Sequence, residues 1–307
     1  MSIARRIFFS TPITASRDDQ YIGLSDAQHQ LIEGLATKVN ELGYVVEVFA
    51  RLGITDSPAA TSMWSFEEVD RVMRQCVGAV FMGLPRWIFT TPGSEARLAT
   101  EFSYYEAGAA MTLGLPRLVL VEEGLRPRVI FDWKLQYITI FPENAGASWL
   151  ESPEFQHAWQ GWKQRLDQRR DLFLGYSGKS GGLAKNVKQY LQLLGVTVLD
   201  WKTDFVPGST ILEQIQETAA RCSGGIFLFT KDDQLAGEGE LAAPRDNVVF
   251  EAGYFAAVRG KQRVLIIREK GSKLPADLGG DIYAALDDRA DITPIQDDIR
   301  KFVEHRL

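Results

Sequence analysis

A carboxylate in apolar surroundings is the first candidate for chemistry in this chain. Glu251 lies between Phe250 and Ala252, within a predicted helix over 247–258 whose other residues are nearly all apolar. Because burying an unpaired charge is costly, this side chain must open onto a cleft, pair with a cation or cap a neighbouring loop. Glu251 is therefore a candidate functional residue, with these three possibilities open.

Arg245 precedes the same helix and is the candidate cation for Glu251. Its guanidinium can bind a phosphate or hold the carboxylate ionised. The alternative is that the pair only ties the helix to the preceding loop. The sequence leaves both interpretations open.

A glycine-rich segment, 176–183, supplies a second candidate site. Only Tyr176 and Ser177 separate Gly175 from Gly178, whereas a Walker A loop has four residues between its glycines, so a P-loop is excluded. The exposed amides of such a turn can still bind a phosphate at a helix start. The alternative is a flexible turn.

The elements that must position these residues occur twice along the chain. The segment 104–124 aligns with 249–271, which places Glu106 on Glu251. Upstream, both halves show a helical pattern that is closed by a glycine and followed by a β-branched strand. The order of strands and helices is therefore duplicated.

Alternating strands and helices predict a parallel sheet with helices on both faces. In the second half, strands are expected near 171–176, 196–201, 224–230 and 263–268, and helices near 183–194, 210–221 and 247–258. A helix within 142–170 closes the first half, and 294–307 is its counterpart. The predicted fold class is α/β, with two tandem flavodoxin-like domains, 1–168 and 169–307, each a parallel sheet flanked by helices. Ligands are expected beyond the carboxyl ends of the strands.

Composition limits the classes of protein to which the chain can belong. It has 307 residues, of which 45% are hydrophobic and 24% charged, as is typical of a globular protein. The net charge of −6 argues against nucleic acid or anionic lipid as a partner. Short apolar runs and the absence of a secretory h-region favour a cytoplasmic protein without a membrane span. Two cysteines and three histidines provide no metal-ligand spacing, so we expect no metal site.

Two motifs of the second half resemble those of TIR-like predicted nucleotide-binding proteins. The first is the arginine-x-asparagine-hydrophobic-phenylalanine-glutamate-x-glycine-tyrosine-phenylalanine signature, present as RDNVVFEAGYF from Arg245 to Phe255. The second is a proline-x-aspartate-x-x-glycine segment, present as PADLGG from Pro275 to Gly280. The resemblance covers about 170–290. In this family, known from bacterial antiphage systems that include fusions to STING-like sensors, the domain can hydrolyse NAD+ at the nicotinamide–ribose bond.

The resemblance implies roles for named residues of the second domain. Glu251 would be the catalytic glutamate, with Arg245 and Asp277 as neighbours at the substrate site. Tyr176 and Ser177 would line the first loop. NAD+ is then a substrate rather than a cofactor, and one carboxylate suffices because nicotinamide leaves as a neutral group.

Two aromatic residues beside the second loop are candidates for stacking on nicotinamide or adenine. These are Trp201 and Phe205. Packing in the core is the favoured alternative for both.

The first domain departs from the family pattern. It keeps Glu106-Ala107-Gly108, but Arg97 lies farther from the glutamate than Arg245 does from Glu251. It also resembles nucleoside deoxyribosyltransferase-like folds, whose glutamate faces a ribosyl site. We therefore expect a diverged sensor or scaffold with Glu106 and Arg97 at a ligand site, and a catalytic role is the alternative. Its extra loops, around 12–25 and 87–100, would elaborate specificity.

Three functions are compatible with these features. The leading one is an NAD+ glycohydrolase effector in antiphage defence, activated by a cyclic nucleotide or other nucleotide at the N-terminal domain, or by self-association as a homo-oligomer. The second is a nucleoside or nucleotide ribosyl hydrolase or transferase. The third is a non-catalytic nucleotide-binding assembly module.

Overall fold

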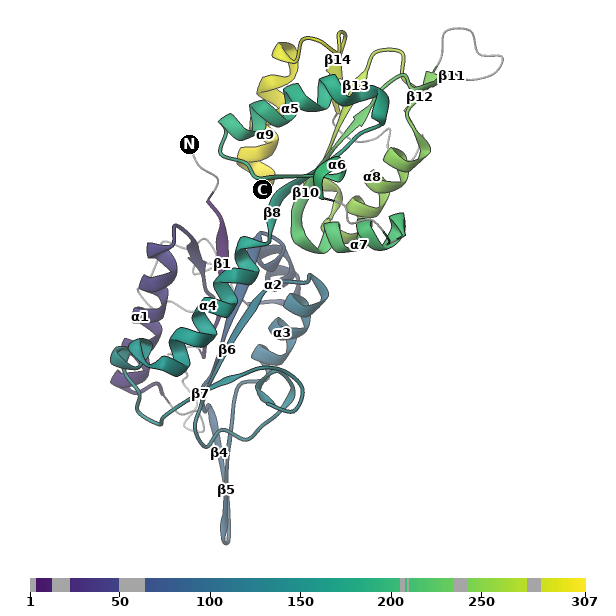
Figure 1. The fold of residues 1–307 in the computed structure, drawn as a ribbon. Coiled ribbons are helices and arrows are strands. Elements are labelled where there is room, and N and C mark those ends of the chain that lie inside the picture. Colours follow the sequence, from purple (N-terminus) through teal and green to yellow (C-terminus); the bar gives the residue numbers. More distant parts are fainter. Residues whose placement is uncertain are drawn as a thin grey trace. The chain divides into compact units, whose positions relative to one another are not determined.

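The computed structural model describes residues 4–12, 23–49, 64–204, 208, 210–234, 242–274 and 283–307. The chain divides into two compact units, Ala4–Gln168 and Arg169–Leu307. Each unit has its own parallel sheet and its own hydrophobic core (Figure 1). The predicted α/β class is confirmed.

The N-terminal unit is built on a parallel sheet with the strand order β2-β1-β3-β6-β7. Its strands are β1 (Arg6–Ser10), β2 (Val45–Glu47), β3 (Cys76–Gly83), β6 (Arg117–Glu122) and β7 (Thr139–Phe141). One face packs against α1 (Asp26–Glu41) and α4 (Pro153–Asp167), and the other against α2 (Phe66–Met73) and α3 (Phe102–Thr112). The predicted closing helix is α4, which buries Phe155, Trp159, Trp162 and Leu166.

The C-terminal unit repeats this architecture with the strand order β14-β13-β10-β8-β9. Its strands are β8 (Arg170–Gly175), β9 (Val198–Asp200), β10 (Cys222–Phe229), β13 (Val264–Glu269) and β14 (Tyr283–Leu286). One face packs against α5 (Gly181–Leu193) and α9 (Gln296–Arg306), and the other against α7 (Ile211–Arg221) and α8 (Asp246–Arg259). Numbered along each repeat, both sheets have the order 2-1-3-4-5 of flavodoxin-like folds. The internal repeat seen in the sequence is therefore a repeat of the fold.

Several helices begin where the sequence provides a capping side chain. Ser25 and Thr210 form capping boxes at the starts of α1 and α7, with Gln28 and Glu213 as the reciprocal partners. At α4, Ser152 accepts a hydrogen bond from the Phe155 amide, and Pro153 occupies the first turn. These local signals explain why the helix starts were predictable.

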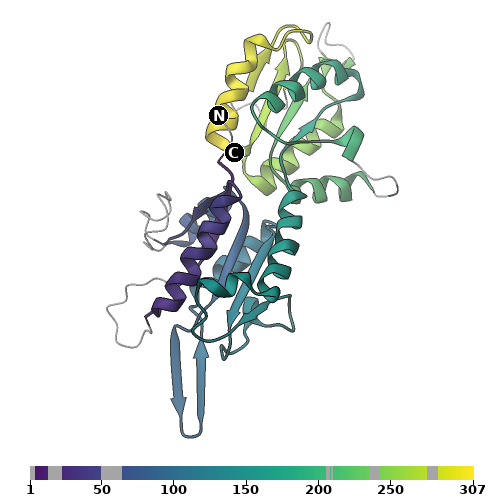
Figure 2. The same cartoon turned by 60° about the vertical axis from the view of Figure 1, so that its left-hand side comes forward.

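Two parts of the sheets differ from the expectation. The second half contains a fifth strand, β14, which the prediction missed because this short edge strand has alternating burial and a weak hydrophobic signal. Where an extra loop was expected over 87–100, the chain forms an exposed hairpin of β4 (Trp87–Thr91) and β5 (Ser94–Leu98). Figure 2 shows this hairpin extending from its unit. Residues 13–22 of the other extra loop lie outside the described residues.

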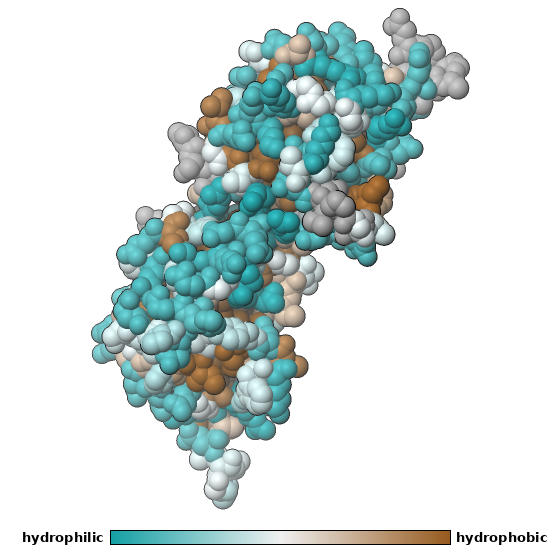
Figure 3. Space-filling model, in the orientation of Figure 1, coloured by the Kyte–Doolittle hydropathy of each residue, from teal (hydrophilic) through white to brown (hydrophobic). Residues whose placement is uncertain are grey.

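The described helices are not membrane spans, since none of them is both long and apolar enough to cross a bilayer. Hydrophilic residues dominate the surface in Figure 3, with apolar residues exposed among them. Exposed apolar side chains are frequent in the N-terminal unit between η2 (Val129–Phe131) and β7, where Trp133 is 61% and Leu135 71% exposed.

A substitution at Gly224 tests how closely strand β10 packs against the start of β13. A Cβ atom at this position would lie 2.6 Å from the backbone oxygen of Arg263, which cannot move without shifting the neighbouring strand. Gly224→Ala should therefore lower the free energy of unfolding of the C-terminal unit by about 1–3 kcal/mol. Chemical denaturation monitored by circular dichroism measures this change. Gly182→Ala, at an exposed helical glycine with nothing within 4 Å of the added atom, is the matched control and should be neutral or slightly stabilising.

Candidate functional site

The carboxyl ends of β8 and β10 form the edge at which a ligand is expected in the C-terminal unit. The chain leaves β8 towards β9 on one side and leaves β10 towards β13 on the other. In doubly wound sheets this switch in direction marks the ligand-binding position. Tyr176 follows β8 and Thr230 follows β10, so the first candidate loop lies at this edge.

Glu251 is buried at the same edge. It lies on α8 with Val248, Ala252 and Phe255 on the buried face of the helix, and it is only 8% exposed. Among the described residues its Oε2 has no hydrogen-bond partner. Burial raises the pKa of Glu251 from 4.5 to about 8. Burial therefore favours the protonated form of this carboxyl group.

Gly175, the last residue of β8, makes room for this carboxyl group. A Cβ atom built on Gly175 would lie 2.8 Å from Glu251 Oε2 and 2.4 Å from Phe227 Cδ1. Any side chain here would displace the carboxylate or the aromatic ring. The absence of a side chain at Gly175 therefore allows the Glu251 carboxyl group to lie where it does. The sequence did not predict this role.

Arg245 does not pair with Glu251 as the sequence analysis had allowed. Its Nη1 lies 3.3 Å from Asp233 Oδ2, and its side chain is 54% exposed. The pKa of Glu251 is raised by burial, with no cation counteracting it. Arg245 instead tethers the start of α8 to β11 (Asp233–Gln234), and its guanidinium is accessible to a ligand.

Tyr176 and Trp201 form a partly buried aromatic pair beside the first loop. The ring centroids are 5.7 Å apart, and Trp201 Nε1 donates to the backbone oxygen of Tyr176 at 3.0 Å. The Tyr176 hydroxyl donates to Asp200 Oδ1 at 2.8 Å, so it is already committed. Lys202 Nζ lies 5.3 Å from the centre of the Tyr176 ring. Trp201 packs against both cores of the unit, in agreement with the core-packing alternative, and its half-buried ring still reaches solvent.

A chain of buried hydroxyl groups joins the two loops of the switch point. Ser177 Oγ lies 3.2 Å from Ser180 Oγ, which in turn hydrogen-bonds to Thr230 Oγ1. Thr230 Oγ1 donates to Asp232 Oδ2 at 3.0 Å. Lys179 Nζ donates to the backbone oxygen of Asp232 at 2.6 Å. Ser177 therefore belongs to a network that fixes the loops together.

The sequence analysis missed several members of this edge. Thr230, Asp232 and Asp200 are polar residues at the carboxyl ends of predicted strands, a position that could have identified them. Arg289 had no such signal, because it follows the unpredicted strand β14. It hydrogen-bonds to Glu269 Oε2 through Nη2 at 2.6 Å and closes the edge on that side.

Two predicted site residues, Phe205 and Asp277, lie outside the described residues. Among the described residues, no group of three or more His, Cys, Asp and Glu side chains could hold a metal ion.

The N-terminal unit contains a second buried carboxyl group at the corresponding position. Glu106, on α3, is 6% exposed, and burial raises its pKa to about 7. Unlike Glu251, it has a partner of its own chain, because Trp64 Nε1 donates to its Oε1 at 2.9 Å. Ser10, whose hydroxyl donates to Ser103 Oγ at 3.1 Å, also lowers the pKa of Glu106 against the effect of burial. We expected Arg97 to share a ligand site with Glu106, but its guanidinium forms ion pairs with two other glutamates. It lies 3.0 Å from Glu95, which is also on β5, and 2.6 Å from Glu143, which follows β7.

Strand register explains the difference between the two carboxyl groups. Phe81 and Phe227 are each the sixth residue of the central strand of their unit. Ser10 pairs with Phe81, and Gly175 pairs with Phe227, so Ser10 and Gly175 are equivalent. The Ser10 hydroxyl lowers the pKa of Glu106, whereas Gly175 has no side chain and Glu251 Oε2 lies within the space that a Cβ atom would take.

Trp64 completes the closure of the N-terminal unit. Its indole is surrounded by the rings of Phe66, Phe102 and Tyr105, with centroids 4.5–6.0 Å away. Glu106 is thus capped by the protein itself.

Glu251→Gln should stabilise the C-terminal unit increasingly as pH rises. The pKa of about 8 lies above the ordinary 4.5, so the protein is stabilised by this group below pH 4.5 and loses that contribution as pH rises through 8. The neutral amide has no charge to desolvate, and the full effect is at most about 4–5 kcal/mol. Thermal unfolding of variant and wild type between pH 5 and 9 measures it. A difference that stays constant over this range would contradict the burial of the carboxyl group. Glu217→Gln, at an exposed side chain of the same unit, is the control.

Comparison with known proteins identifies the domain that carries Glu251. Residues 171–288 match the family model described as "CAP12/Pycsar effector protein, TIR domain". Similar curated proteins include CD-NTase-associated protein 12 of Sphingobacterium faecium, 31% identical over 36% of this chain and 35% of that protein. The Pycsar effector protein PaPycTIR of Pseudomonas aeruginosa is 28% identical over 38% of this chain and 42% of that protein.

Other similarities are less informative about function. The protein YuaY of Escherichia coli, described as uncharacterized, is 32% identical over 39% of this chain and 40% of that protein. The TIR domain of the Toll-related receptor TRR-2 from Hydra magnipapillata aligns over 43% of this chain and 98% of that domain at 14% identity, with a TM-score of 0.34. The chain spans about two fifths of the length of the curated relatives it matches. The C-terminal unit is therefore similar, over residues 171–288, to the TIR domains of CAP12/Pycsar effector proteins.

Proposed function

We propose that the C-terminal domain hydrolyses NAD+ at the nicotinamide–ribose bond and acts as an effector in antiphage defence. The observation that carries this proposal is the buried, uncompensated carboxyl group of Glu251 at the switch point of a domain that matches the CAP12/Pycsar TIR family. The other acidic residues of this edge, such as Asp200 and Glu269, already have cationic partners. Glu251 is the carboxylate that a substrate would neutralise.

The reaction needs a group that stabilises positive charge on the ribose. As the C–N bond breaks, its electron pair leaves with nicotinamide, which becomes neutral, and the ribose acquires oxocarbenium character. Ionised Glu251 would stabilise that charge and accept hydrogen bonds from the ribose hydroxyls. Water then adds to the anomeric carbon and releases one proton, which gives ADP-ribose. No separate acid is needed for the leaving group.

The raised pKa of Glu251 fits a substrate that brings a positively charged ring to the carboxyl group. In the empty site, burial favours the protonated form of the carboxyl group. The positively charged nicotinamide ring would favour the ionised form by direct attraction, so binding and ionisation are coupled. Arg245, exposed at the start of the same helix, would bind a phosphate of the substrate. Trp201 would stack against one of the rings, and Tyr176 and Ser177 would shape the loop between them.

The N-terminal domain is proposed as the regulatory part of the protein. Its Glu106 carboxyl group already accepts a hydrogen bond from the Trp64 indole, whereas Glu251 Oε2 has no partner among the described residues. This favours a sensor or scaffold over a second catalytic centre. Activation by a nucleotide signal or by self-association into a homo-oligomer belongs to this proposal.

Glu251→Gln should reduce NAD+ turnover at least about 100-fold, because it removes the charge that stabilises the transition state. Glu217→Gln, at an exposed side chain of the same unit, is the matched control and should leave turnover unchanged. Chromatography of concentrated protein incubated with NAD+ and a panel of nucleotides measures nicotinamide and ADP-ribose. For the wild type, kcat/KM should rise about tenfold per pH unit below pH 8, as the required carboxylate ionises.

The same assay distinguishes the competing functions. Release of a free nucleobase from a nucleotide, with NAD+ left intact, would favour a nucleotide ribosyl hydrolase. Nucleotide-dependent oligomers without turnover, unaffected by Glu251→Gln, would favour a non-catalytic assembly module.

Gly175→Ser should move the Glu251 carboxyl group. The added Cβ atom would overlap Glu251 Oε2 and the Phe227 ring, so we expect NAD+ turnover to fall more than about tenfold. Ser10→Gly, the reciprocal change in the other unit, should leave turnover unchanged. Circular dichroism must show that Gly175→Ser remains folded. A folded variant with wild-type turnover would show that turnover does not depend on the position of the Glu251 carboxyl group.

A further inference from the structure

Arg289 lies just after β14 and connects three segments at the carboxyl-terminal edge of the C-terminal sheet. Its Nε and Nη2 both donate to Oε2 of Glu269, the last residue of β13, at 2.9 and 2.6 Å. Nη2 also donates to the backbone oxygen of Lys231, after β10, at 3.1 Å, and Nη1 donates to that of Lys179, after β8, at 3.5 Å. One guanidinium group therefore bridges the segments 176–180 and 230–234 and ties both to β13.

Glu269 fixes the orientation of this guanidinium group. Its side chain is only 8% exposed, and its Oε2 also accepts a hydrogen bond from the Lys231 amide at 2.7 Å. Because Glu269 binds both Nε and Nη2 of Arg289, the plane of the guanidinium group is set and Nη1 is left for Lys179.

Asp232 gives the guanidinium group a second carboxylate. The Asp232 side chain is completely buried, and its Oδ1 lies 3.9 Å from Arg289 Nη2. That oxygen has no hydrogen-bond partner among the described residues. Loss of the guanidinium group would leave this buried carboxylate without a cationic partner in the described part of the chain.

The bridged segments carry residues that the proposed function places at the substrate. Tyr176 and Ser177 precede Lys179 in the first segment. Asp233 lies in the second segment and pairs with Arg245, whose Nη1 lies 3.3 Å from the Asp233 Oδ2. The spacing of these substrate-binding residues is therefore set in part by the bridge.

We propose that Arg289 is a positioning residue, which holds segment 176–180 and the Asp233–Arg245 pair at the spacing that binds the substrate. This inference rests on the proposed hydrolysis of NAD+ and adds a residue to it. Arg289 acts through the two segments and not on Glu251, whose raised pKa is caused by burial. Removing the guanidinium group should therefore weaken substrate binding and leave the ionisation of Glu251 unchanged.

Arg289→Lys separates this role from compensation of charge alone. A lysine keeps a positive charge beside Glu269, but its ammonium group lacks the planar fork that binds a carboxylate and two backbone oxygens together. If Arg289 only compensated the charge of Glu269, the lysine variant would behave as the wild type. A bridging role predicts that it resembles Arg289→Ala.

Amide hydrogen exchange of the full chain, followed by mass spectrometry without substrate, tests the bridge directly. In both variants, segments 176–180 and 230–234 should exchange at least about tenfold faster than in the wild type, because local opening no longer breaks charge-assisted hydrogen bonds. Exchange in α5 should stay as in the wild type, which shows that the unit remains folded. Unchanged exchange in the two segments would overturn the proposal.

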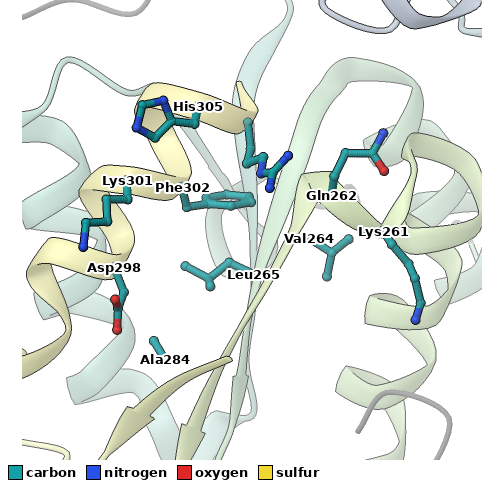
Figure 4. Close-up of a pocket in the computed structure, with 10 residues that line it drawn as sticks. Lys261, Gln262, Val264, Leu265, Ala284, Asp298, Lys301, Phe302 and His305 are labelled. Atoms are coloured by element: carbon teal, nitrogen blue, oxygen red, sulfur yellow. The ribbon is translucent and has the colours of Figure 1, made fainter. Parts of the chain in front are cut away.

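Helix α9 provides the matched control. It lines a pocket of about 640 Å³ at the first residues of β13, where Figure 4 shows Phe302 and His305 along the helix. Arg300, on the same helix, pairs with Asp297 and with Glu304, the latter at 3.1 Å. Arg300→Ala removes a guanidinium group with two carboxylate partners from the same unit, and it should leave exchange of both segments and the kinetics unchanged.

Steady-state kinetics with NAD+ measures the effect on the substrate site. Both Arg289 variants should raise KM at least about tenfold and change kcat less than about threefold, since the segments bind the substrate and Glu251 is untouched. The dependence of kcat/KM on pH should keep the midpoint of the wild type. A wild-type KM in Arg289→Ala, or wild-type kinetics in Arg289→Lys, would overturn the proposal.

These measurements distinguish failure of this inference from failure of the proposed function. A wild type that leaves NAD+ intact, or full turnover in Glu251→Gln, would contradict the proposed function and remove the substrate role of Arg289 with it. Turnover that is lost in Glu251→Gln but keeps its KM in Arg289→Ala would contradict the role of Arg289 alone.

Discussion

The burial of one carboxyl group without a compensating charge is the constraint on which the C-terminal domain depends. Helix α8 has an apolar buried face, and Glu251 occupies a position on that face between Val248 and Phe255. Nothing in the described part of the chain donates to its Oε2. A neutral residue here would stabilise the protein above the ordinary pKa of a glutamate, and buried carboxyl groups with strongly raised pKa values are frequent at functional sites. The absence of a side chain at Gly175 is part of the same arrangement, because it leaves the carboxyl group room at the end of β8.

Two other acidic residues at this edge, Asp200 and Glu269, have partners that offset the cost of burying their charge. Burial alone would raise the pKa of Asp200, but hydrogen bonds from Tyr176 and Lys188 outweigh that effect, and the pKa lies below its ordinary value. Burial is likewise outweighed at Glu269, by Arg289 and the Lys231 amide. Such paired carboxylates fix the loops around the switch point. They therefore have a structural role. They differ from Glu251 in having hydrogen-bond and ion-pair partners, and not in how deeply they are buried.

Duplication of the fold gives an internal comparison of two solutions to the same problem. Both units bury a glutamate on the helix that follows their central strand. In the N-terminal unit, the Trp64 indole donates to Glu106 from within the chain. In the C-terminal unit no equivalent donor reaches Glu251 Oε2 among the described residues. One backbone architecture thus supports two arrangements of a buried carboxyl group, one with a donor from its own chain and one without.

The sequence by itself determined the repeat, the α/β class and the helix that carries Glu251, because these follow from hydrophobic period, capping residues and local motifs. It also identified Tyr176, Ser177 and Trp201 as neighbours of one edge, since residues after parallel strands converge there. Only the tertiary structure decided partners. In the structure Arg245 forms an ion pair with Asp233 rather than Glu251, and Arg97 forms one with Glu143. The structure also contains β14 at the edge of the C-terminal sheet. Pairings of this kind depend on contacts between residues distant in the chain, and neither periodicity nor motif spacing encodes which of several nearby charges a flexible side chain will reach.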